Sequence, residues 1–238
     1  MESAVNDIDC FIAPSRFSAV KHQEMGLAAN FAHLPHFVPR AENDISSRQQ
    51  EWGKAQPYFL FVGRLEKLKG LQTIIPIFRE YGKAQLWIAG TGSYEPTLRR
   101  LAGDNDDIRF LGHLSEQALR HVYRNAVAVI APSLCYETFG QVVVEAFSQH
   151  TPALVRNLGA MPELIEESGG GVIYNCDAEL VAAMDSLVTS ITLREEFGER
   201  GYQAYLRNWT AEVHLDIYLA LVQKFRAAKQ GPATHSAG

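Results

Sequence analysis

Two glutamates, Glu137 and Glu145, bracket the stretch YETFGQVVVE and could bind a polar ligand. Because Phe139 and Gly140 open a predicted helix, Glu137 is expected in the preceding loop and Glu145 inside the helix, about a turn and a half later. The neighbours of Glu145 in sequence are apolar, and a carboxylate in such surroundings needs hydroxyl or cationic partners. The hydroxyls of a ribose would serve. The alternative is a position on the solvent-exposed face of an ordinary helix.

The start of the same helix is a candidate anion site. The first backbone amides of a helix have no partner within it, and the helix dipole places positive charge at that end. Phe139, Gly140 and Gln141 therefore offer donors to a phosphate or another polar group.

A pair of cations follows an earlier apolar run, in the stretch GRLEKLKG (63–70). Gly63 lets a ligand approach the backbone closely. Arg64 can form paired hydrogen bonds to phosphate oxygens and Lys69 can act as a point charge, so the two suit a diphosphate. Composition alone favours the alternative, in which both side chains are simply exposed to solvent.

The stretch GTGSYE (90–95) is similar to a dinucleotide-binding fingerprint but departs from it. Its sixth position is Glu95, where that motif has glycine or alanine, and no Gly-Lys-Ser/Thr follows as in a P-loop. We interpret this stretch as a tight turn from a strand into a helix.

The candidate residues follow short apolar runs that we predict to be strands. These runs do not alternate polar and apolar residues, which is typical of parallel strands buried on both faces. The predicted strands occupy residues 9–15, 58–64, 85–90, 108–112, 126–133, 152–156 and, with a weaker pattern, 171–174.

Helical patterns lie between these strands and after the last one. Residues 178–205 are predicted to be helical, and residues 211–228 form a long amphipathic helix. Strand–helix alternation at this spacing predicts right-handed βαβ units and an α/β fold with a doubly wound parallel sheet. Ligands of such sheets bind beyond the carboxyl ends of the strands, where the candidate residues lie.

Composition and charge exclude several classes of protein. The 238 residues are 47% hydrophobic and 21% charged, which is typical of a globular chain, and the net charge of −5 argues against a nucleic-acid partner bound through bulk positive charge. Cys10, Cys135 and Cys176 lie far apart, so we expect reduced cytosolic thiols and no zinc site. The first residues lack a targeting pattern, and no apolar run approaches the roughly 20 residues of a membrane span.

Four ordered stretches resemble the C-terminal half of a GT-B-fold glycosyltransferase. They are FVGRLEKLKG, LWIAGTGSY, IRFLGHLS and VIAPSLCYETFGQVVVEAFSQHTPALVRNLGAMPE. The group they resemble is the large retaining one, group 1 or family four, which has a Glu-x7-Glu motif. The resemblance covers most of the chain. It implies a Rossmann-like fold and transfer of a sugar from a nucleoside-diphosphate sugar to a glycan, a lipid-linked molecule or another acceptor.

The resemblance also implies roles for individual residues. Arg64 and Lys69 would bind the donor diphosphate, and together with Glu137 they form the expected catalytic set. Glu137 would approach the hydroxyls of the donor sugar, and Glu145 would hold the ribose hydroxyls. The other expected donor-binding residues are Gly63, then Leu111, Gly112, His113 and Leu114 beside the nucleobase, and Thr138, Phe139, Gly140 and Gln141 beside the sugar and the distal phosphate.

The implied mechanism requires no metal and no cofactor. Negative charge develops on the leaving diphosphate, where Arg64, Lys69 and the helix-start amides would stabilise it. Glu137 would help to position the sugar and stabilise its positive charge. We do not assign Glu137 as a covalent nucleophile.

The chain departs from the complete two-domain pattern of the family. Residues 1–38 match only the closing strand and helix of an N-terminal Rossmann-like domain that is otherwise absent. We interpret residues 39–57 as a linker, 58–205 as the nucleotide-sugar-binding domain, 206–228 as the crossing helix and 229–238 as a disordered tail. We therefore expect this chain to bind either the missing N-terminal domain or a separate chain that takes its place. We expect a cytoplasmic location, with association at the inner face of a membrane left open.

Three other functions share some of these sequence features. A non-catalytic nucleotide-sugar-binding module, or a split transferase that needs a partner, is the main alternative. Glu95 counts against a dinucleotide-dependent oxidoreductase. A glycosidase needs two carboxylates that flank one bond, which Glu145 on a ribose would not do.

The isolated chain is expected to bind a nucleotide sugar but to transfer it poorly or not at all. The reason is that the family binds its acceptor largely through the N-terminal domain. The test is a comparison of donor binding with transferase turnover for the isolated chain. Robust transfer would contradict this expectation, while binding without turnover even after a missing half is supplied would favour the non-catalytic module.

Overall fold

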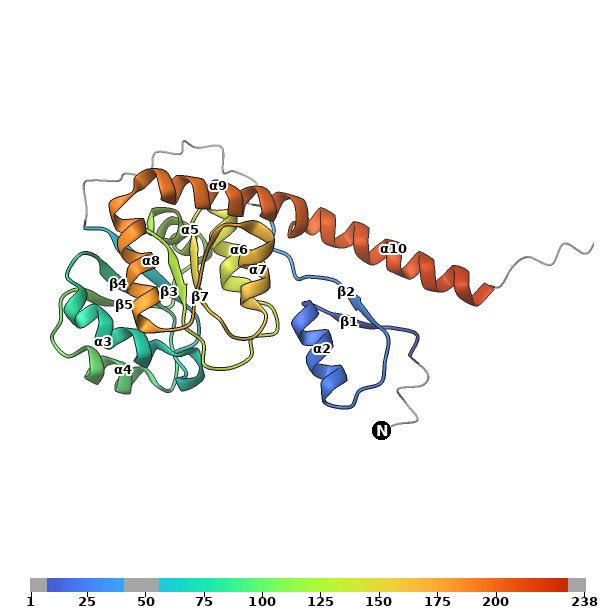
Figure 1. The fold of residues 1–238 in the computed structure, drawn as a ribbon, viewed down its shortest axis with the longest axis horizontal. Coiled ribbons are helices and arrows are strands. Elements are labelled where there is room, and N and C mark those ends of the chain that lie inside the picture. Colours follow the sequence, from blue (N-terminus) through green and yellow to red (C-terminus); the bar gives the residue numbers. More distant parts are fainter. Residues whose placement is uncertain (1–7, 41–55, 231–238) are drawn as a thin grey trace, which may run out of the picture.

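The computed structural model describes residues 8–40 and 56–230, which form a large α/β body and a small N-terminal unit (Figure 1). In Figure 1 the small unit lies beside the body, below the long helix α10 (Ala211–Gln230) that projects away from it. The α/β class predicted from the sequence is confirmed.

The body contains a six-stranded sheet whose strands all run parallel. Its strands are β3 (Tyr58–Val62), β4 (Gln85–Ala89), β5 (Ile108–Gly112), β6 (Val129–Ala131), β7 (Ala153–Arg156) and β8 (Gly171–Tyr174). The spatial order is β5-β4-β3-β6-β7-β8, so the direction of strand addition reverses between β3 and β6. This is the strand order of the Rossmann fold, and the crevice for a ligand lies at the point of reversal.

Helices cover both faces of this sheet. They are α3 (Leu71–Tyr81), α4 (Glu95–Ala102), α5 (Glu116–Asn125), α6 (Gln141–Ser148), α7 (Met161–Ser168), α8 (Asp177–Thr189) and α9 (Ile191–Asn208), with a 3-10 turn, η1 (Lys67–Lys69), before α3. Residues 178–205 are helical as predicted, but a break at Ser190 divides the stretch into α8 and α9. The Ser190 hydroxyl accepts a hydrogen bond from the Leu193 amide at 3.1 Å and so begins α9 as an N-cap.

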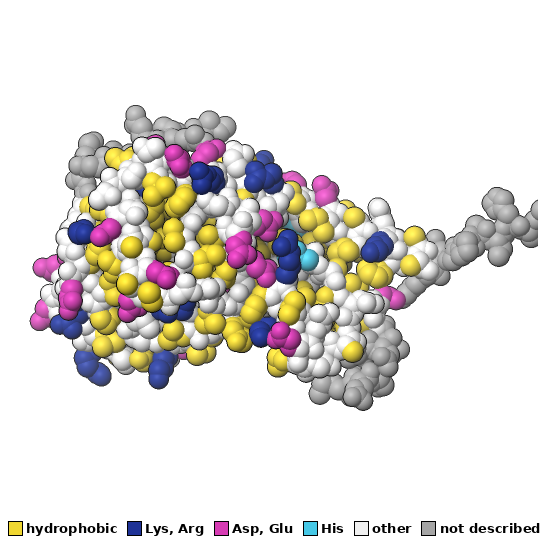
Figure 2. Space-filling model, in the orientation of Figure 1, with side chains coloured by type: hydrophobic (Ala, Val, Ile, Leu, Met, Phe, Trp, Pro, Cys, Tyr) yellow, Lys and Arg dark blue, Asp and Glu magenta, His cyan; other side chains and the backbone are white. Residues whose placement is uncertain are grey.

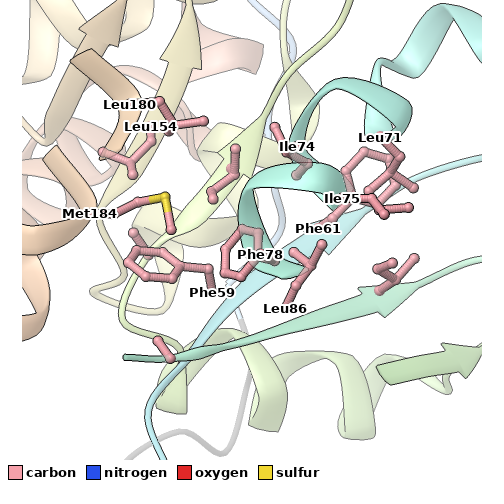
Figure 3. Close-up of a cluster of buried hydrophobic side chains, with 14 of the residues drawn as sticks. Phe59, Phe61, Leu71, Ile74, Ile75, Phe78, Leu86, Leu154, Leu180 and Met184 are labelled. Atoms are coloured by element: carbon pink, nitrogen blue, oxygen red, sulfur yellow. The ribbon is translucent and has the colours of Figure 1, made fainter. Parts of the chain in front are cut away.

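The core explains why the strand sequences do not alternate. Phe59 and Phe61 of β3 pack in the cluster with α3, α4 and α8, which Figure 3 shows, whereas Tyr58 and Leu60 pack with α5 on the other side. Both sets of side chains are at most 6% exposed. Strand β3 is therefore buried on both faces, as its continuous apolar sequence predicts, whereas the edge strand β5 has an exposed Arg109 and the edge strand β8 is only partly buried.

The N-terminal unit holds one more strand than the sequence predicts. Its elements are β1 (Phe11–Ala13), α2 (Arg16–Glu24) and β2 (Phe31–His33), and β1 pairs with β2 in parallel. The expectation of one strand and one helix in residues 1–38 is thus corrected. Strand β2 is only three residues long and Pro35 follows it closely, so its sequence gives almost no pattern.

Helix α2 is fixed to the body through its N-terminal end. The Glu163 carboxylate on α7 accepts hydrogen bonds from the Arg16 amide at 3.0 Å and the Phe17 amide at 2.5 Å. A carboxylate is favourable there because it meets the positive end of the helix dipole. The Phe17 ring also packs edge-on against Tyr136, with ring centroids 5.1 Å apart. The small unit therefore touches the loop that contains Glu137.

Helix α10 extends to Gln230, two residues beyond the predicted end of the C-terminal helix. Its apolar side is exposed, with Leu215, Tyr218, Leu219 and Val222 between 36% and 53% accessible. Figure 2 shows hydrophobic side chains along the part of the molecule where α10 projects. Within residues 8–40 and 56–230, no helix combines the length and apolarity needed to cross a membrane. Most of the predicted linker and residues 231–238 of the predicted tail lie outside the described residues.

Two glycines that flank α3 allow a test of how closely the turn before α3 approaches the end of β6. Gly70 (φ +81°) and Gly82 (φ +62°) both adopt a left-handed conformation. A Cβ on Gly70 would lie 2.0 Å from the Pro132 carbonyl oxygen at the end of β6, whereas a Cβ on Gly82 would meet nothing within 4 Å.

We expect Gly82→Ala to lower the free energy of unfolding by about 1 kcal/mol, the cost of the left-handed backbone alone. Gly70→Ala should lower it by about 2–4 kcal/mol, because overpacking adds to that cost. Urea unfolding monitored by circular dichroism measures both values. Equal losses in the two variants would contradict the close approach.

Candidate functional site

The candidate residues gather where β3 and β6 lie side by side. Leu60 of β3 is in register with Val129 of β6, so the carboxyl ends of the two strands meet at one edge of the sheet. The Leu134 amide donates to the Leu68 carbonyl at 2.8 Å, which joins the loop after β6 to η1. This contact holds the cationic stretch that follows β3 against the loop that carries Glu137.

Lys69 and Glu137 form an ion pair at this edge. The Lys69 Nζ lies 2.6 Å from Glu137 Oε1, and the two side chains are 26% and 21% exposed. The Ser133 hydroxyl donates to the same oxygen at 2.8 Å. Among the described residues, all hydrogen bonds and the ion pair of the Glu137 carboxylate involve Oε1, so Oε2 can accept hydrogen bonds from a ligand.

The backbone around Glu137 is held in place by the turn before α7. The Glu137 carbonyl accepts from the Ala160 amide at 3.0 Å. Gly159 has a φ of +72°, and a Cβ there would lie 2.8 Å from the Glu137 amide nitrogen. Glycine is therefore required for this approach, and the approach fixes where the Glu137 carboxylate lies.

Cys135 adjoins the same carboxylate, with its Sγ 3.9 Å from Glu137 Oε1. Burial raises the pKa of the Cys135 thiol, and the negative charge of Glu137 raises it further. Lys69 acts in the opposite direction and lowers this pKa. The thiol is thus a local reporter of the charges on Glu137 and Lys69.

The second glutamate, Glu145, lies on α6 and is bound to a tyrosine. The Tyr123 hydroxyl on α5 donates to Glu145 Oε2 at 2.7 Å. Burial raises the pKa of the Glu145 carboxyl, and the hydrogen bond from Tyr123 lowers it. A hydroxyl partner was expected from the apolar neighbours of Glu145, and the protein itself supplies one.

Glu145 lines a cavity of about 490 Å³ between α5, α6, α9 and the segment before residue 41. Tyr123, Tyr202, Tyr205, Gln141 and Arg120 also line it. The volume is within the range of small-molecule pockets. Glu145 therefore borders a hollow of small-molecule size rather than lying on an open helix surface.

The start of α6 has the form of an anion site. Gly140 is the N-cap with a φ of +112°, and a Cβ there would lie 2.8 Å from the Met161 Cγ. No carbonyl of the described residues is recorded as accepting from the amides of Phe139, Gly140 or Gln141. Phe139 is buried and packs against the His36 ring, while the Gln141 side chain donates to the Phe37 carbonyl at 3.1 Å.

The remaining predicted residues lie along the same edge without forming specific contacts to the glutamates. Gly63 follows β3 and donates to the Ala89 carbonyl, and the Arg64 side chain is exposed with no ion pair recorded among the described residues. Thr138 is exposed, and its carbonyl accepts from the Ser15 hydroxyl at 2.7 Å. The nucleobase segment comprises Leu111 and Gly112 at the end of β5, the exposed His113 and the half-buried Leu114.

The stretch GTGSYE is a turn, as interpreted. A Cβ on Gly90 would lie 1.9 Å from the Gly63 carbonyl oxygen, and one on Gly92 would lie 2.4 Å from that of Leu65. The glycines therefore serve close packing between two loops. Within the described part of the chain, no group of three or more His, Cys, Asp or Glu side chains could hold a metal ion.

Four contact residues of the site were missed by sequence reasoning as functional neighbours. They are Ser15, Tyr123, Ser133 and Cys135. Ser133 precedes Glu137 by four residues, a spacing that could have indicated contact. Ser15 and Tyr123 come from distant elements, so no local sequence pattern predicts their contacts with the site.

Comparison with known proteins gives a consistent result. Residues 42–204 match the family described as Glycosyl transferases group 1. An uncharacterized glycosyltransferase of Methanocaldococcus jannaschii, MJ1607, is 33% identical over 57% of this chain and 37% of its own length. The glycogen synthase of Mycobacterium tuberculosis is 30% identical over 82% of this chain and 48% of its own length. The chain thus spans about half the length, or less, of these curated relatives.

Solved structures share the fold. A sucrose-phosphate synthase from Thermosynechococcus elongatus superimposes with a TM-score of 0.79 at 19% identity, over 95% of this chain and 61% of that protein. Anabaena Alr3699/HepE in complex with UDP gives a TM-score of 0.77 at 17% identity, over 95% of this chain and 67% of that protein.

The thiol of Cys135 provides a test of the charge pair. Replacing Glu137 with Gln removes a negative charge that raises the pKa of Cys135, so this pKa should fall and the thiolate fraction at pH 7.5 should rise. We expect alkylation by iodoacetamide to become about threefold faster, since lower intrinsic nucleophilicity offsets part of the gain. Exposed Cys176 serves as the internal control, and an unchanged rate at Cys135 would contradict the contact with Glu137.

Proposed function

The chain belongs to the group 1 glycosyltransferases, and we propose that it forms the donor-binding half of a retaining glycosyltransferase. Such an enzyme moves a sugar from a nucleoside-diphosphate sugar to an acceptor. The proposal rests above all on the Lys69–Glu137 ion pair at the start of α6, where the Rossmann-type sheet has its ligand crevice.

The leaving diphosphate is proposed to lie against Lys69, Arg64 and the first amides of α6. The Lys69 ammonium has three donors, so it can keep its bond to Glu137 while it binds a phosphate oxygen. The exposed Arg64 is available to form paired hydrogen bonds with other oxygens of the same group. These fixed positive charges would stabilise the negative charge that develops as the bond to the sugar breaks.

The sugar and the ribose are proposed to bind at the two glutamates. Glu137 Oε2 would accept from the hydroxyls of the donor sugar, and its charge would favour the positive character that the sugar develops. Glu145 Oε1 would accept from a ribose hydroxyl at the mouth of the 490 Å³ cavity. The nucleobase would then lie along residues 111–114, mostly against the backbone.

The acceptor is proposed to be a glycan or a lipid-linked saccharide. One relative is a glycogen synthase, and another is a lipopolysaccharide core biosynthesis glycosyltransferase from Rhizobium meliloti, 28% identical over 70% of this chain. A membrane-surface location would suit a lipid-linked acceptor, whereas a glycan acceptor needs none.

A thermal-shift panel with UDP, GDP, ADP and their sugars tests the donor site. A ligand at 100 times its dissociation constant stabilises the folded state by about 2.7 kcal/mol, which corresponds to a rise in Tm of roughly 5–10 °C for a chain of this size. We expect such a rise with at least one nucleotide. The rise should be largely lost in Glu145→Ala and Lys69→Ala, because each removes a proposed contact to the donor.

Matched controls separate binding from general damage. Lys67→Ala removes a cation from the same 3-10 turn, and Glu167→Gln removes an exposed carboxylate from α7, so both should keep the wild-type shift. No stabilisation of the wild-type chain by any of the nucleotides would refute the donor site. Stabilisation by NAD but not by a nucleoside diphosphate would favour an oxidoreductase instead.

A further inference from the structure

The contact between Tyr123 and Glu145 has no part in the roles proposed above. We propose that Tyr123 is a positioning residue that holds the Glu145 carboxylate in the orientation and charge state needed to bind the ribose of the donor. This inference rests on the proposed function, because it concerns the same donor site.

Tyr123 is itself held at both ends. Its side chain is almost completely buried, at 1% exposed, and its hydroxyl donates to Glu145 Oε2 at 2.7 Å. Its carbonyl accepts from the buried Thr151 hydroxyl at 2.7 Å, and the Tyr58 hydroxyl donates to the preceding carbonyl, of Val122, at 2.9 Å. Two buried hydroxyls therefore anchor the end of α5 from which the ring reaches Glu145.

The hydrogen bond leaves Glu145 ready to accept from a ligand. A carboxylate has about four lone-pair positions on two oxygens, and Tyr123 uses one of those on Oε2. Oε1 has no contact recorded among the described residues and belongs to a side chain that lines the cavity. By fixing one oxygen, Tyr123 restricts the side-chain rotations of Glu145 before a ligand binds. Binding then costs less conformational entropy than it would with a flexible glutamate.

Tyr123 also favours the ionised form of the Glu145 carboxyl. In that form both oxygens can accept hydrogen bonds from ribose hydroxyls. Burial raises the pKa of the Glu145 carboxyl, and the hydrogen bond from Tyr123 opposes that rise. Burial and the negative charge of Glu145 raise the pKa of the Tyr123 hydroxyl, so it stays protonated and continues to donate. Among the residues that the structure describes, the other charged or titratable groups that line the cavity are Arg40, Glu116, Arg120, Tyr202 and Tyr205.

Two of the donors among these neighbours already have other partners. Arg120 pairs with Glu116 on its own helix, and the Tyr205 hydroxyl donates to the Val38 carbonyl at 3.0 Å. Without the Tyr123 hydroxyl, the pKa of Glu145 should rise. Binding that depends on the carboxylate is lost as pH falls through that pKa, so the loss should move to higher pH.

The chain offers a matched control for this proposal. Tyr58→Phe removes a buried hydroxyl that binds the same end of α5 and donates to the Val122 carbonyl rather than to Glu145. Its ring stacks on Trp87 at 3.8 Å, a contact that phenylalanine retains. An effect of Tyr123→Phe that arises only from a loosened helix end should therefore appear in Tyr58→Phe as well.

The experiment compares ribose recognition in the wild-type chain, Tyr123→Phe, Tyr58→Phe and Glu145→Gln. Dissociation constants for UDP, GDP and ADP and for their 2′-deoxy forms are measured by calorimetry between pH 5 and pH 9. For the nucleotide that binds most tightly, the preference for ribose over deoxyribose should fall at least about threefold in Tyr123→Phe, as in Glu145→Gln, and stay unchanged in Tyr58→Phe. The acid limb of binding should move to higher pH only in Tyr123→Phe.

An unchanged ribose preference in Tyr123→Phe, or an equal loss in Tyr58→Phe, would overturn the proposal. If no nucleoside diphosphate bound the wild-type chain, the proposed function would fail and the ribose role of Tyr123 with it. Titration of the Glu145 carboxyl by NMR, assigned with Glu145→Gln, separates the two failures. A higher carboxyl pKa in Tyr123→Phe would show that Tyr123 still controls this carboxylate, and an equal pKa would overturn that contact too.

Discussion

Gly70 lies so close to the Pro132 carbonyl that a side chain cannot fit between them, and the geometry of the site depends on this approach. It brings the turn after β3 against the end of β6, strands that are adjacent in the sheet although about 70 residues separate them in sequence. The same approach places Lys69 beside Glu137. Without it, the cationic stretch and the acidic loop would be two unrelated surface features.

The buried surroundings make these charged groups more than a surface ion pair. Exposed pairs contribute little to stability because water screens them and the side chains lose freedom. Lys69 and Glu137 are each about three-quarters shielded, and the Glu137 backbone is fixed by Ala160 and Gly159. The proposed donor would meet oriented charges there that need little rearrangement, which is how preorganised sites stabilise developing charge.

The main elements of the fold were predictable because local sequence fixes them. Six apolar runs became the six strands of the main sheet, and the turn at GTGSYE was interpreted correctly, since glycine and buried hydrophobic residues act over short distances. Strand β2 was missed because three residues before a proline carry too little pattern. The break at Ser190 was missed because helix propensity continues across it, and only the serine cap reveals it.

The sequence by itself determined which residues could act: the two glutamates, the two cations and the helix start, and, through resemblance, the family. Tertiary structure alone decided their partners. Tyr123 reaches Glu145 from another helix, and Lys69 reaches Glu137 across 68 positions, because strand order and packing set these distances. Hydrogen bonds between distant elements leave no periodic pattern in a sequence. The pKa of the Glu145 carboxyl is therefore set by the fold: burial raises it and one tyrosine hydroxyl opposes the rise.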